Sequence, residues 1–204
     1  MEDSRWYTAS FGTIYQILTT IYFTTFTKMK LTNNQKEWIE MFVYIFIGYL
    51  IAVGANKGLS YALDTDYPVV AVVSGSMEHG NPESTYYPFM QEKGYSQDDL
   101  KKFSFADGMR KGDIAVIRNI PFEKLKVGDV IVYVVPGKEP IIHRVVEINS
   151  EGLITKGDNN GAIDQASGGI APVIKAENVK GKAIARAPML GYVKLTYMKL
   201  TGRI

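Results

Sequence analysis

The sequence predicts a mainly β domain of antiparallel strands, preceded by one transmembrane α-helix near the N-terminus. After about residue 60, apolar runs of strand length alternate with Gly, Pro, Asn and Asp. Ahead of these runs, the segment from Met41 to Asn56 is apolar and carries no charge. A chain of 204 residues is long enough for one folded domain and a membrane segment, and short for two ordinary domains.

The apolar segment predicts a helix that crosses a bilayer from about Trp38 to about Leu59. A hydrocarbon core of about 30 Å needs roughly 20 helical residues. Phe, Tyr, Ile and Leu occupy every face of this segment, whereas a helix on a soluble domain has a polar stripe. We therefore favour a membrane span over a buried core helix. No small-x-small cleavage site follows the apolar run, so a cleaved signal peptide is not indicated.

Lysines predict the orientation of this helix. Lys28, Lys30 and Lys36 precede it, and only Lys57 lies close behind it. The positive-inside rule then places the N-terminus in the cytoplasm and the residues after about 60 outside the cell membrane. The expected organisation is a cytoplasmic segment (1–37), a transmembrane helix (38–59) and an extracytoplasmic domain (60–204), with the lipid bilayer as a partner.

The first 28 residues leave three alternatives open. The stretch from Trp6 to Thr27 is uncharged but rich in threonine. It fits a second membrane segment, an interfacial segment, or an upstream extension with the true start at Met29. The abrupt change to Lys, Asn, Gln and Glu at Met29 favours the extension. An intact-mass measurement of native protein beginning at Met1 would exclude it.

The strands of the β domain are predicted from apolar runs bounded by turn residues. Between about residues 79 and 111 the strand pattern stops, and we expect an insertion there with a short helix near Asp98–Phe103. The predicted strands are 68–73, 113–117, 129–135, 140–148, 152–156 and 182–187.

Composition excludes several classes of function. The net charge of +2 and the pI near 8.6 are too mild to indicate a nucleic-acid partner. The absence of cysteine excludes disulfides, thiolate metal sites and a cysteine nucleophile. With two histidines and no HExxH pair, neither a metal nor another cofactor is expected.

The sequence Val-Val-Ser-Gly-Ser-Met at residues 72–77 contains a candidate nucleophile. If the preceding strand persists, Ser74 and Ser76 project to the same side. One hydroxyl can then attack while the other stabilises the oxyanion, and Gly75 leaves room for a substrate backbone. The alternative interpretation is that both serines only form a turn.

A serine nucleophile needs a base, and only two histidines are present. His143 lies inside a predicted strand on the side of Ile141 and Val145, which holds it on a rigid element. His79 lies in a loop rich in Gly, Asn and Pro, and we interpret it as a solvated loop residue.

A catalytic triad also needs an acid to orient the histidine. Asp158 and Asp164 both follow the predicted strand 152–156, in a polar turn. Either carboxylate can serve as the third member of a triad. The residues alone do not choose between them.

Together, the ordered motifs Ser-Gly-Ser-Met, Lys-Gly-Asp-Ile-Ala-Val-Ile, Ile-His-Arg-Val and Lys-Gly-Asp-Asn-Asn resemble the signal peptidase I family. The match is to the archaeal and endoplasmic-reticulum branch, which has histidine where the bacterial branch has a lysine base, and it covers nearly everything after residue 38. The resemblance implies a signal-peptidase-type antiparallel β-sheet catalytic domain. It implies Ser76 as nucleophile, His143 as general base, Asp164 as the orienting acid and Asp158 as a supporting residue.

The same resemblance implies an oxyanion hole formed by the Ser76 backbone N–H and the Ser74 hydroxyl. The reaction implied is removal of signal peptides from preproteins, with cleavage after small residues at positions −1 and −3. We expect the extended substrate to lie along Val72, Val73, Gly75 and Met77. Membrane partner subunits are left open.

Two departures from the family pattern concern the region after the nucleophile. His79 stands where the family usually has proline, which keeps it as a minor catalytic candidate, and the insertion is longer than the bacterial spacing. Two rival functions remain: a self-cleaving serine hydrolase of the same fold, and a non-enzymatic membrane-tethered β-domain. The first rival class is soluble and uses lysine, whereas this chain has an apolar anchor and histidine.

Overall fold

The structure, a computed structural model, describes residues 16–17, 20, 32–80 and 85–202. It divides into two compact units, residues 1–53 and residues 54–204. The alternatives for residues 1–28, including the choice between Met1 and Met29 as the start, fall almost entirely outside the described residues.

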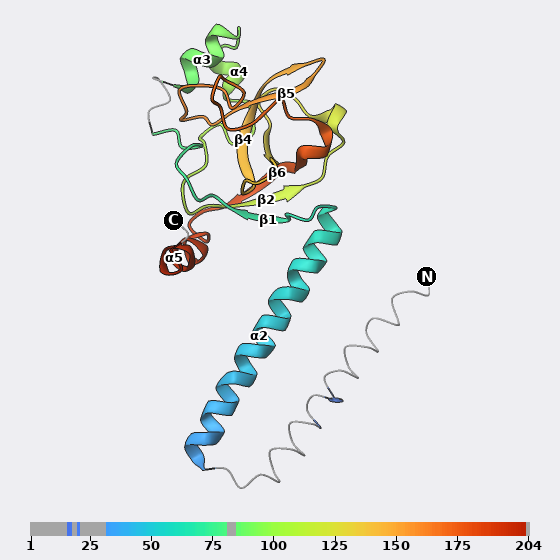
Figure 1. Cartoon of the computed structure of the whole chain (residues 1–204), viewed down its shortest axis with the longest axis vertical. Coiled ribbons are helices and arrows are strands. Elements are labelled where there is room, and N and C mark those ends of the chain that lie inside the picture. The colour runs from blue at the N-terminus through green and yellow to red at the C-terminus, as the bar shows by residue number, and fades with distance from the viewer. Residues whose placement is uncertain (1–15, 18–19, 21–31, 81–84, 203–204) are drawn as a thin grey trace, which may run out of the picture. The chain divides into compact units, whose positions relative to one another are not determined.

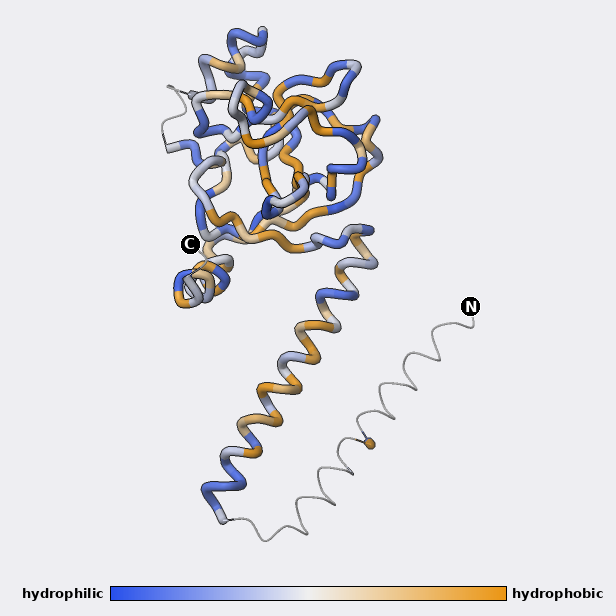
Figure 2. The backbone as a smooth tube through the Cα atoms, in the orientation of Figure 1, coloured by the Kyte–Doolittle hydropathy of each residue, from blue (hydrophilic) through white to orange (hydrophobic). Residues whose placement is uncertain are grey.

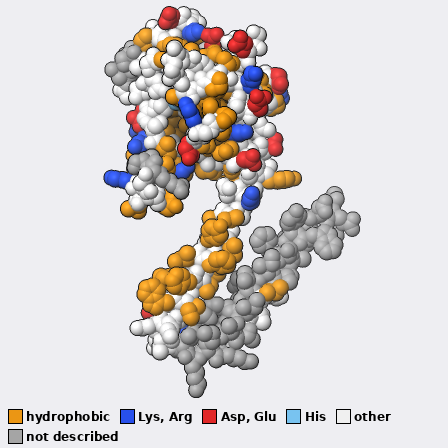
Figure 3. Space-filling model, in the orientation of Figure 1, with side chains coloured by type: hydrophobic (Ala, Val, Ile, Leu, Met, Phe, Trp, Pro, Cys, Tyr) orange, Lys and Arg blue, Asp and Glu red, His pale blue; other side chains and the backbone are white. Residues whose placement is uncertain are grey.

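One long helix, α2, runs from Asn33 to Leu63. It begins at a capping box, in which Thr32 and Gln35 satisfy each other's backbone N–H groups. Trp38, Phe42 and Tyr44 are more than 60% exposed. Figure 2 colours much of the helix as hydrophobic, and Figure 3 shows apolar side chains on its surface. By length and composition, α2 is able to cross a membrane. It extends beyond the predicted 38–59 at both ends: the capped polar turn before Trp38 is also helical, and the helix continues past Leu59 to Leu63.

The β domain is built on one six-stranded sheet in which all neighbouring strands are antiparallel, as the sequence predicted. The sheet is curled, and its strand order is β1-β2-β6-β3-β4-β5 (Figure 1). Its strands are β1 (Val69–Ala71), β2 (Ile114–Arg118), β3 (Val130–Tyr133), β4 (Ile141–Asn149), β5 (Gly152–Lys156) and β6 (Val179–Ala187).

The observed strands follow the predicted ones closely, with differences at their ends. β5 has the predicted bounds, whereas β6 begins earlier, at Val179, where it pairs with Tyr133. β1 is shorter than the predicted 68–73. The next residue, Val72, still forms backbone hydrogen bonds with Asp113 and Gly112, just before β2. The backbone then turns toward Ser76.

The insertion at about 79–111 contributes two helices, α3 (Tyr86–Glu92) and α4 (Gln97–Leu100). α4 corresponds to the helix predicted near Asp98–Phe103, and it starts at a capping box formed by Ser96 and Asp99. α3 was not predicted. The insertion belongs to the folded domain, because Tyr86, Met90 and Leu100 pack in one core cluster with Val146 and Ile154 of the sheet.

A second short helix that the sequence did not predict, α5 (Tyr192–Leu200), follows β6. Its one buried residue is Leu195. Two 3₁₀ turns, η1 (Phe122–Lys124) and η2 (Ala176–Asn178), complete the described elements.

Candidate active site

Ser76 lies in a tight turn, five residues beyond the end of β1. The turn is closed by a hydrogen bond from the Glu78 N–H to the Gly75 carbonyl, 3.1 Å long. The side chains on either side of the turn are anchored, because Val72 and Met77 are buried in the core with Met109. The Ser76 hydroxyl is therefore presented from a short segment that is fixed at both ends.

The Ser76 hydroxyl meets His143, which comes from the middle of β4. Ser76 Oγ is 3.0 Å from His143 Nε2, and His143 Nδ1 is 2.7 Å from Asp164 Oδ2. His143 is almost completely buried and is paired with Ile131 of β3 across the sheet. The three side chains, far apart in the chain, thus form one continuous hydrogen-bonded series.

Asp164 is held by groups on two strands as well as by His143. The Tyr133 hydroxyl (2.8 Å) and the Thr155 hydroxyl (2.7 Å) both donate to the Oδ2 atom that faces His143. Burial raises the pKa of the Tyr133 phenol, and the adjacent Asp164 carboxylate raises it further, so the phenol stays a donor. With three donors converging on one oxygen, the carboxylate has a single orientation.

Asp158 lies in a different cluster on the opposite face of the same strands. Along β4, His143 and Arg144 point to opposite faces because side chains alternate. Along β5 the same alternation separates Thr155 from Lys156, which is paired with Arg144. The structure therefore brings Asp164, and not Asp158, to His143.

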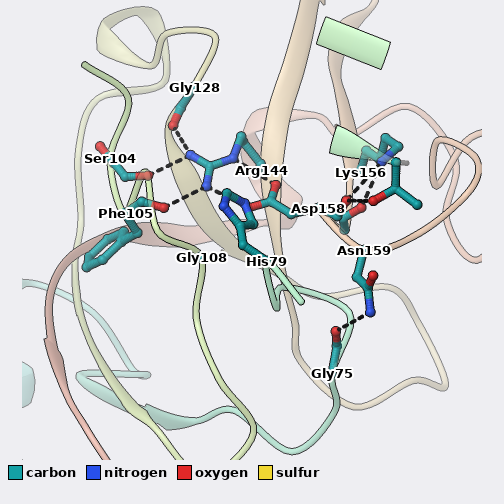
Figure 4. A network of polar contacts seen from close by, with 12 residues as sticks. Gly75, His79, Ser104, Phe105, Gly108, Gly128, Arg144, Lys156, Asp158 and Asn159 are labelled. Carbon is teal, nitrogen blue, oxygen red and sulfur yellow. Dashed lines mark hydrogen bonds and ion pairs between the residues drawn. The ribbon is translucent and has the colours of Figure 1, made fainter. Parts of the chain in front are cut away.

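Arg144 and Asp158 form a buried ion pair with two hydrogen bonds. Arg144 Nε donates to Asp158 Oδ1 (2.8 Å) and Nη2 to Oδ2 (2.7 Å). Burial alone would raise the pKa of Asp158, but the charge and hydrogen bonds of Arg144, with a further bond from His79, hold this pKa below its ordinary value. Arg144 also donates to the carbonyls of Ser104, Phe105 and Gly128 (Figure 4).

Lys156 belongs to this second cluster and not to the site of Ser76. Its ammonium group donates to the carbonyls of Gly157 (3.1 Å) and Asp158 (3.3 Å) and lies over the Phe89 ring. Burial lowers its pKa. Its hydrogen bonds to these carbonyls hold it in the second cluster, so it is not placed to act as the general base, which is a lysine in the bacterial branch.

The interpretation of His79 as a solvated loop residue was wrong. Its side chain is only 7% exposed, and its Nε2 atom is 2.8 Å from Asp158 Oδ2. The ring lies against Tyr86 of α3, with ring centres 4.6 Å apart. The loop composition suggested solvent, but α3, which was not predicted, covers this histidine.

The remaining predicted site residues lie around Ser76. Ser74 Oγ is 3.0 Å from Ser76 Oγ, although the two serines lie in a turn and not in the continued strand. Val72 and Met77 are buried, and both backbone polar groups of Val72 bond to Asp113 and Gly112. Within the described part of the chain, no group of three or more His, Asp or Glu side chains is arranged to hold a metal ion.

Curated relatives identify the family. No family model matches the chain. A protein of Metarhizium robertsii named signal peptidase complex catalytic subunit SEC11 is 34% identical over 149 residues, covering 68% of this chain and 69% of the relative. A protein of the same name from Sclerotinia sclerotiorum is also 34% identical, with the same coverage. The chain belongs to the signal peptidase family.

A third signal peptidase relative extends this similarity to yeast. The catalytic subunit SEC11 of Zygosaccharomyces rouxii is 32% identical over 147 residues, covering 68% of this chain and 71% of the relative. This membership confirms the resemblance to the endoplasmic-reticulum branch of signal peptidases. The chain is accordingly a serine endopeptidase.

Proposed function

We propose that this chain removes signal peptides from secreted preproteins, with Ser76 as the nucleophile, His143 as the general base and Asp164 as the acid that orients it. The single observation that carries the proposal is the continuous series Ser76 Oγ, His143 Nε2, His143 Nδ1, Asp164 Oδ2, with contacts of 3.0 and 2.7 Å. A serine hydroxyl becomes a nucleophile when a base within hydrogen-bonding reach takes its proton. Asp158 supports the site from the second cluster.

In this mechanism His143 moves one proton in each half of the reaction. Nε2 accepts the Ser76 proton as Oγ attacks the scissile carbonyl, and it then passes this proton to the leaving amine. The products of this half are an acyl-enzyme on Ser76 and the free amine end of the mature protein. In the second half His143 takes a proton from water, which attacks the ester, and returns this proton to Ser76 Oγ as the signal peptide leaves.

The oxyanion formed in each half needs donors near Ser76. The Ser76 backbone N–H and the Ser74 hydroxyl are proposed for this role, which the 3.0 Å separation of the two hydroxyl oxygens supports. Removing one such donor lowers kcat by roughly 10²- to 10³-fold in serine hydrolases.

The free edge of β1 offers a place for an extended substrate. Among the described strands, β1 is an outer strand of the sheet, and the flanking Pro68 carbonyl and both Val72 polar groups bond toward the β2 side. Since backbone groups alternate along an antiparallel strand, the N–H and C=O groups of Ala71 and Val73 face the open edge. A substrate strand would pair with these residues and pass Gly75, while the buried Val72 and Met77 support the strand from beneath.

We further propose that α2 crosses the cell membrane with the N-terminus in the cytoplasm, so that residues 60–204 act outside. A helix of this kind confines the site near the bilayer, where signal peptides are also held, and so lowers the entropic barrier to encounter. The curated relatives are named as subunits of a signal peptidase complex. We therefore include preproteins as substrates and additional membrane subunits as partners in the proposal.

The test is cleavage of a signal-bearing preprotein by the full chain in detergent or liposomes, with any subunits that copurify. Ser76→Ala and His143→Ala should each abolish cleavage without unfolding the protein, because one removes the nucleophile and the other the base. Retained cleavage by either variant would refute the assignment.

A serine-directed covalent probe separates this proposal from a non-enzymatic β-domain. The probe should label wild-type protein and the matched variant Ser74→Ala, and it should not label Ser76→Ala. Ser74→Ala should also retain slow cleavage, since it removes an oxyanion donor and leaves the nucleophile. Equal labelling of Ser76→Ala and wild type would favour the binding-domain alternative.

A further inference from the structure

The role of His79 follows from its place between the nucleophile turn and the Arg144–Asp158 pair. His79 lies three residues after Ser76, so its backbone is part of the segment that presents the nucleophile. Its ring is confined by Tyr86 on one side and Gly108 on another, where an added Cβ would come 2.9 Å from the ring. Gly108 has φ of 76°, a conformation that favours glycine. The close fit leaves the imidazole one direction, toward Asp158.

Asp158 is a fixed anchor for this imidazole. Both of its carboxylate oxygens accept hydrogen bonds from Arg144, whose side chain is completely buried and also bonded to three carbonyl groups. An ionised carboxylate only accepts hydrogen bonds, so Nε2 of His79 carries the hydrogen and donates it. The bond therefore ties the segment after Ser76 to a group that cannot easily move.

Asn159, the residue after Asp158, is hydrogen-bonded to the backbone of the nucleophile turn. The Asn159 N–H donates to the Ser76 carbonyl (2.8 Å), and Asn159 Nδ2 donates to the Gly75 carbonyl (3.2 Å). Figure 4 shows this arrangement, with His79 directed at Asp158 and Asn159 directed at Gly75. The contacts close a ring that runs from Ser76 along the chain to His79, across to Asp158, on to Asn159 and back to Ser76.

We propose that His79 is a positioning residue, which through this ring fixes the orientation of the Ser76 hydroxyl toward His143 and of the Ser76 backbone N–H toward the oxyanion. The inference rests on the proposed role of Ser76. His79 itself takes no proton from Ser76, because its Nε2 atom is engaged with Asp158 and His143 already meets the hydroxyl. It acts by fixing the position of Ser76.

The expected effect is on kcat and much less on KM. The substrate edge at Ala71 and Val73 lies before Ser76, where Ala71 is paired with β2 and Val72 is bonded to the residues just before β2, so loss of the ring leaves binding largely intact. Misplacement of a reacting group by about 1 Å can lower the rate on the order of 100-fold. Loosening of the turn without collapse should therefore lower kcat by roughly 10- to 100-fold.

Two substitutions separate the hydrogen bond from the packing of the ring. His79→Phe keeps the contact with Tyr86 but has no donor for Asp158, and His79→Gln keeps an N–H of similar reach without the aromatic ring. We expect His79→Phe to lower kcat 10- to 100-fold with KM within about threefold of wild type, and His79→Gln to recover most of the loss. The acid limb of the pH profile of His79→Gln should keep its wild-type shape, since His79 is not the base.

Asn159→Ala probes the same ring from its other side and remains informative if His79→Phe fails to fold. It removes the exposed hydrogen bond to Gly75 and should also lower kcat. The double variant His79→Phe/Asn159→Ala should show a smaller fold-decrease in kcat than the product of the two single decreases, because both substitutions act on the same ring. Glu147→Gln is the control, because it breaks only the exposed ion pair with Lys93 of the insertion and should leave kcat unchanged.

These measurements use the full chain in detergent or liposomes, with preprotein cleavage and thermal melting followed in parallel. Unchanged kcat in a folded His79→Phe, equal losses in His79→Gln and His79→Phe, or a loss confined to KM would each overturn the inference. In those cases Ser76→Ala would still abolish cleavage, so the proposed function would stand. If Ser76→Ala retained cleavage, both would fall.

Discussion

Asp164→Asn tests which carboxylate completes the triad. Three donors converge on the Oδ2 atom of Asp164, so an asparagine in its place should turn its carbonyl oxygen to the same position. The hydrogen bond to His143 Nδ1 and the histidine tautomer would then survive. What the variant loses is the negative charge that stabilises the imidazolium formed during the reaction.

The size of this loss follows from the short contact between the two groups. Taking about 4 Å between the charge centres and an effective dielectric constant of about 20, the interaction is about 4 kcal/mol. At roughly 1.4 kcal/mol per factor of ten, kcat should fall about 1,000-fold. KM should change little, because Asp164 is almost completely buried and does not reach the substrate edge.

Asp158→Asn is the matched variant, since it makes the same chemical change in the second cluster. It leaves the contact of His143 with Asp164 in place, so its effect on kcat should stay within the 10- to 100-fold range of a loosened turn. Steady-state cleavage and single-turnover acylation should be measured for both variants at neutral pH. If a folded Asp164→Asn retained kcat within tenfold of wild type, or if Asp158→Asn lost more, the assignment of Asp164 would be wrong.

Two further predictions concern stability and backbone approach. The pKa of Asp158 is lowered from 3.8 on folding, so its ionised form stabilises the protein above about pH 4, and this contribution is lost as the pH falls through the lower folded pKa. Asp158→Asn, which leaves the Arg144 charge buried without its partner, should therefore melt well below wild type at pH 7, with a gap that narrows below about pH 4; a gap independent of pH would contradict this. Gly157→Ala should lower kcat at least tenfold, because its Cβ would lie 2.8 Å from the Ser76 carbonyl oxygen and 2.6 Å from Asn160 Nδ2. Wild-type cleavage rates for Gly157→Ala would show that this close approach is not needed.

The strands were readable from the sequence because each pairs an apolar run with turn residues at its ends. β5 illustrates this, since it begins at a glycine and the Gly-Asp-Asn-Asn turn follows it, and its bounds were predicted without error. α3 was missed for the opposite reason. Its seven residues contain a proline and show no clear polar stripe, and Tyr86 and Met90 are buried in one cluster with Leu100 of the insertion and Val146 and Ile154 of the sheet.

The same missing helix explains the error at His79. Loop composition says that a histidine is near solvent, but it says nothing about which distant segment covers it. For a similar reason, the sequence could not decide whether Asp158 or Asp164 contacts His143. Both aspartates follow β5, and only the fold of the loop after it, in which the Asp164 N–H bonds to the Thr155 carbonyl, decides which carboxylate reaches His143.

Neighbouring residues on β4 and β5 point to opposite faces of the sheet. The number of residues in this hairpin therefore decides which face each side chain occupies. Outside the register shift between Val145 and Glu147, removing one residue from either strand would shift it against the other and exchange inward and outward positions. His143 would then lie on the face that Arg144 now occupies, and Arg144 would lie on the face of Ser76. Natural variation in this stretch should consequently proceed by substitution, and single-residue deletions should be eliminated as completely as loss of the serine itself.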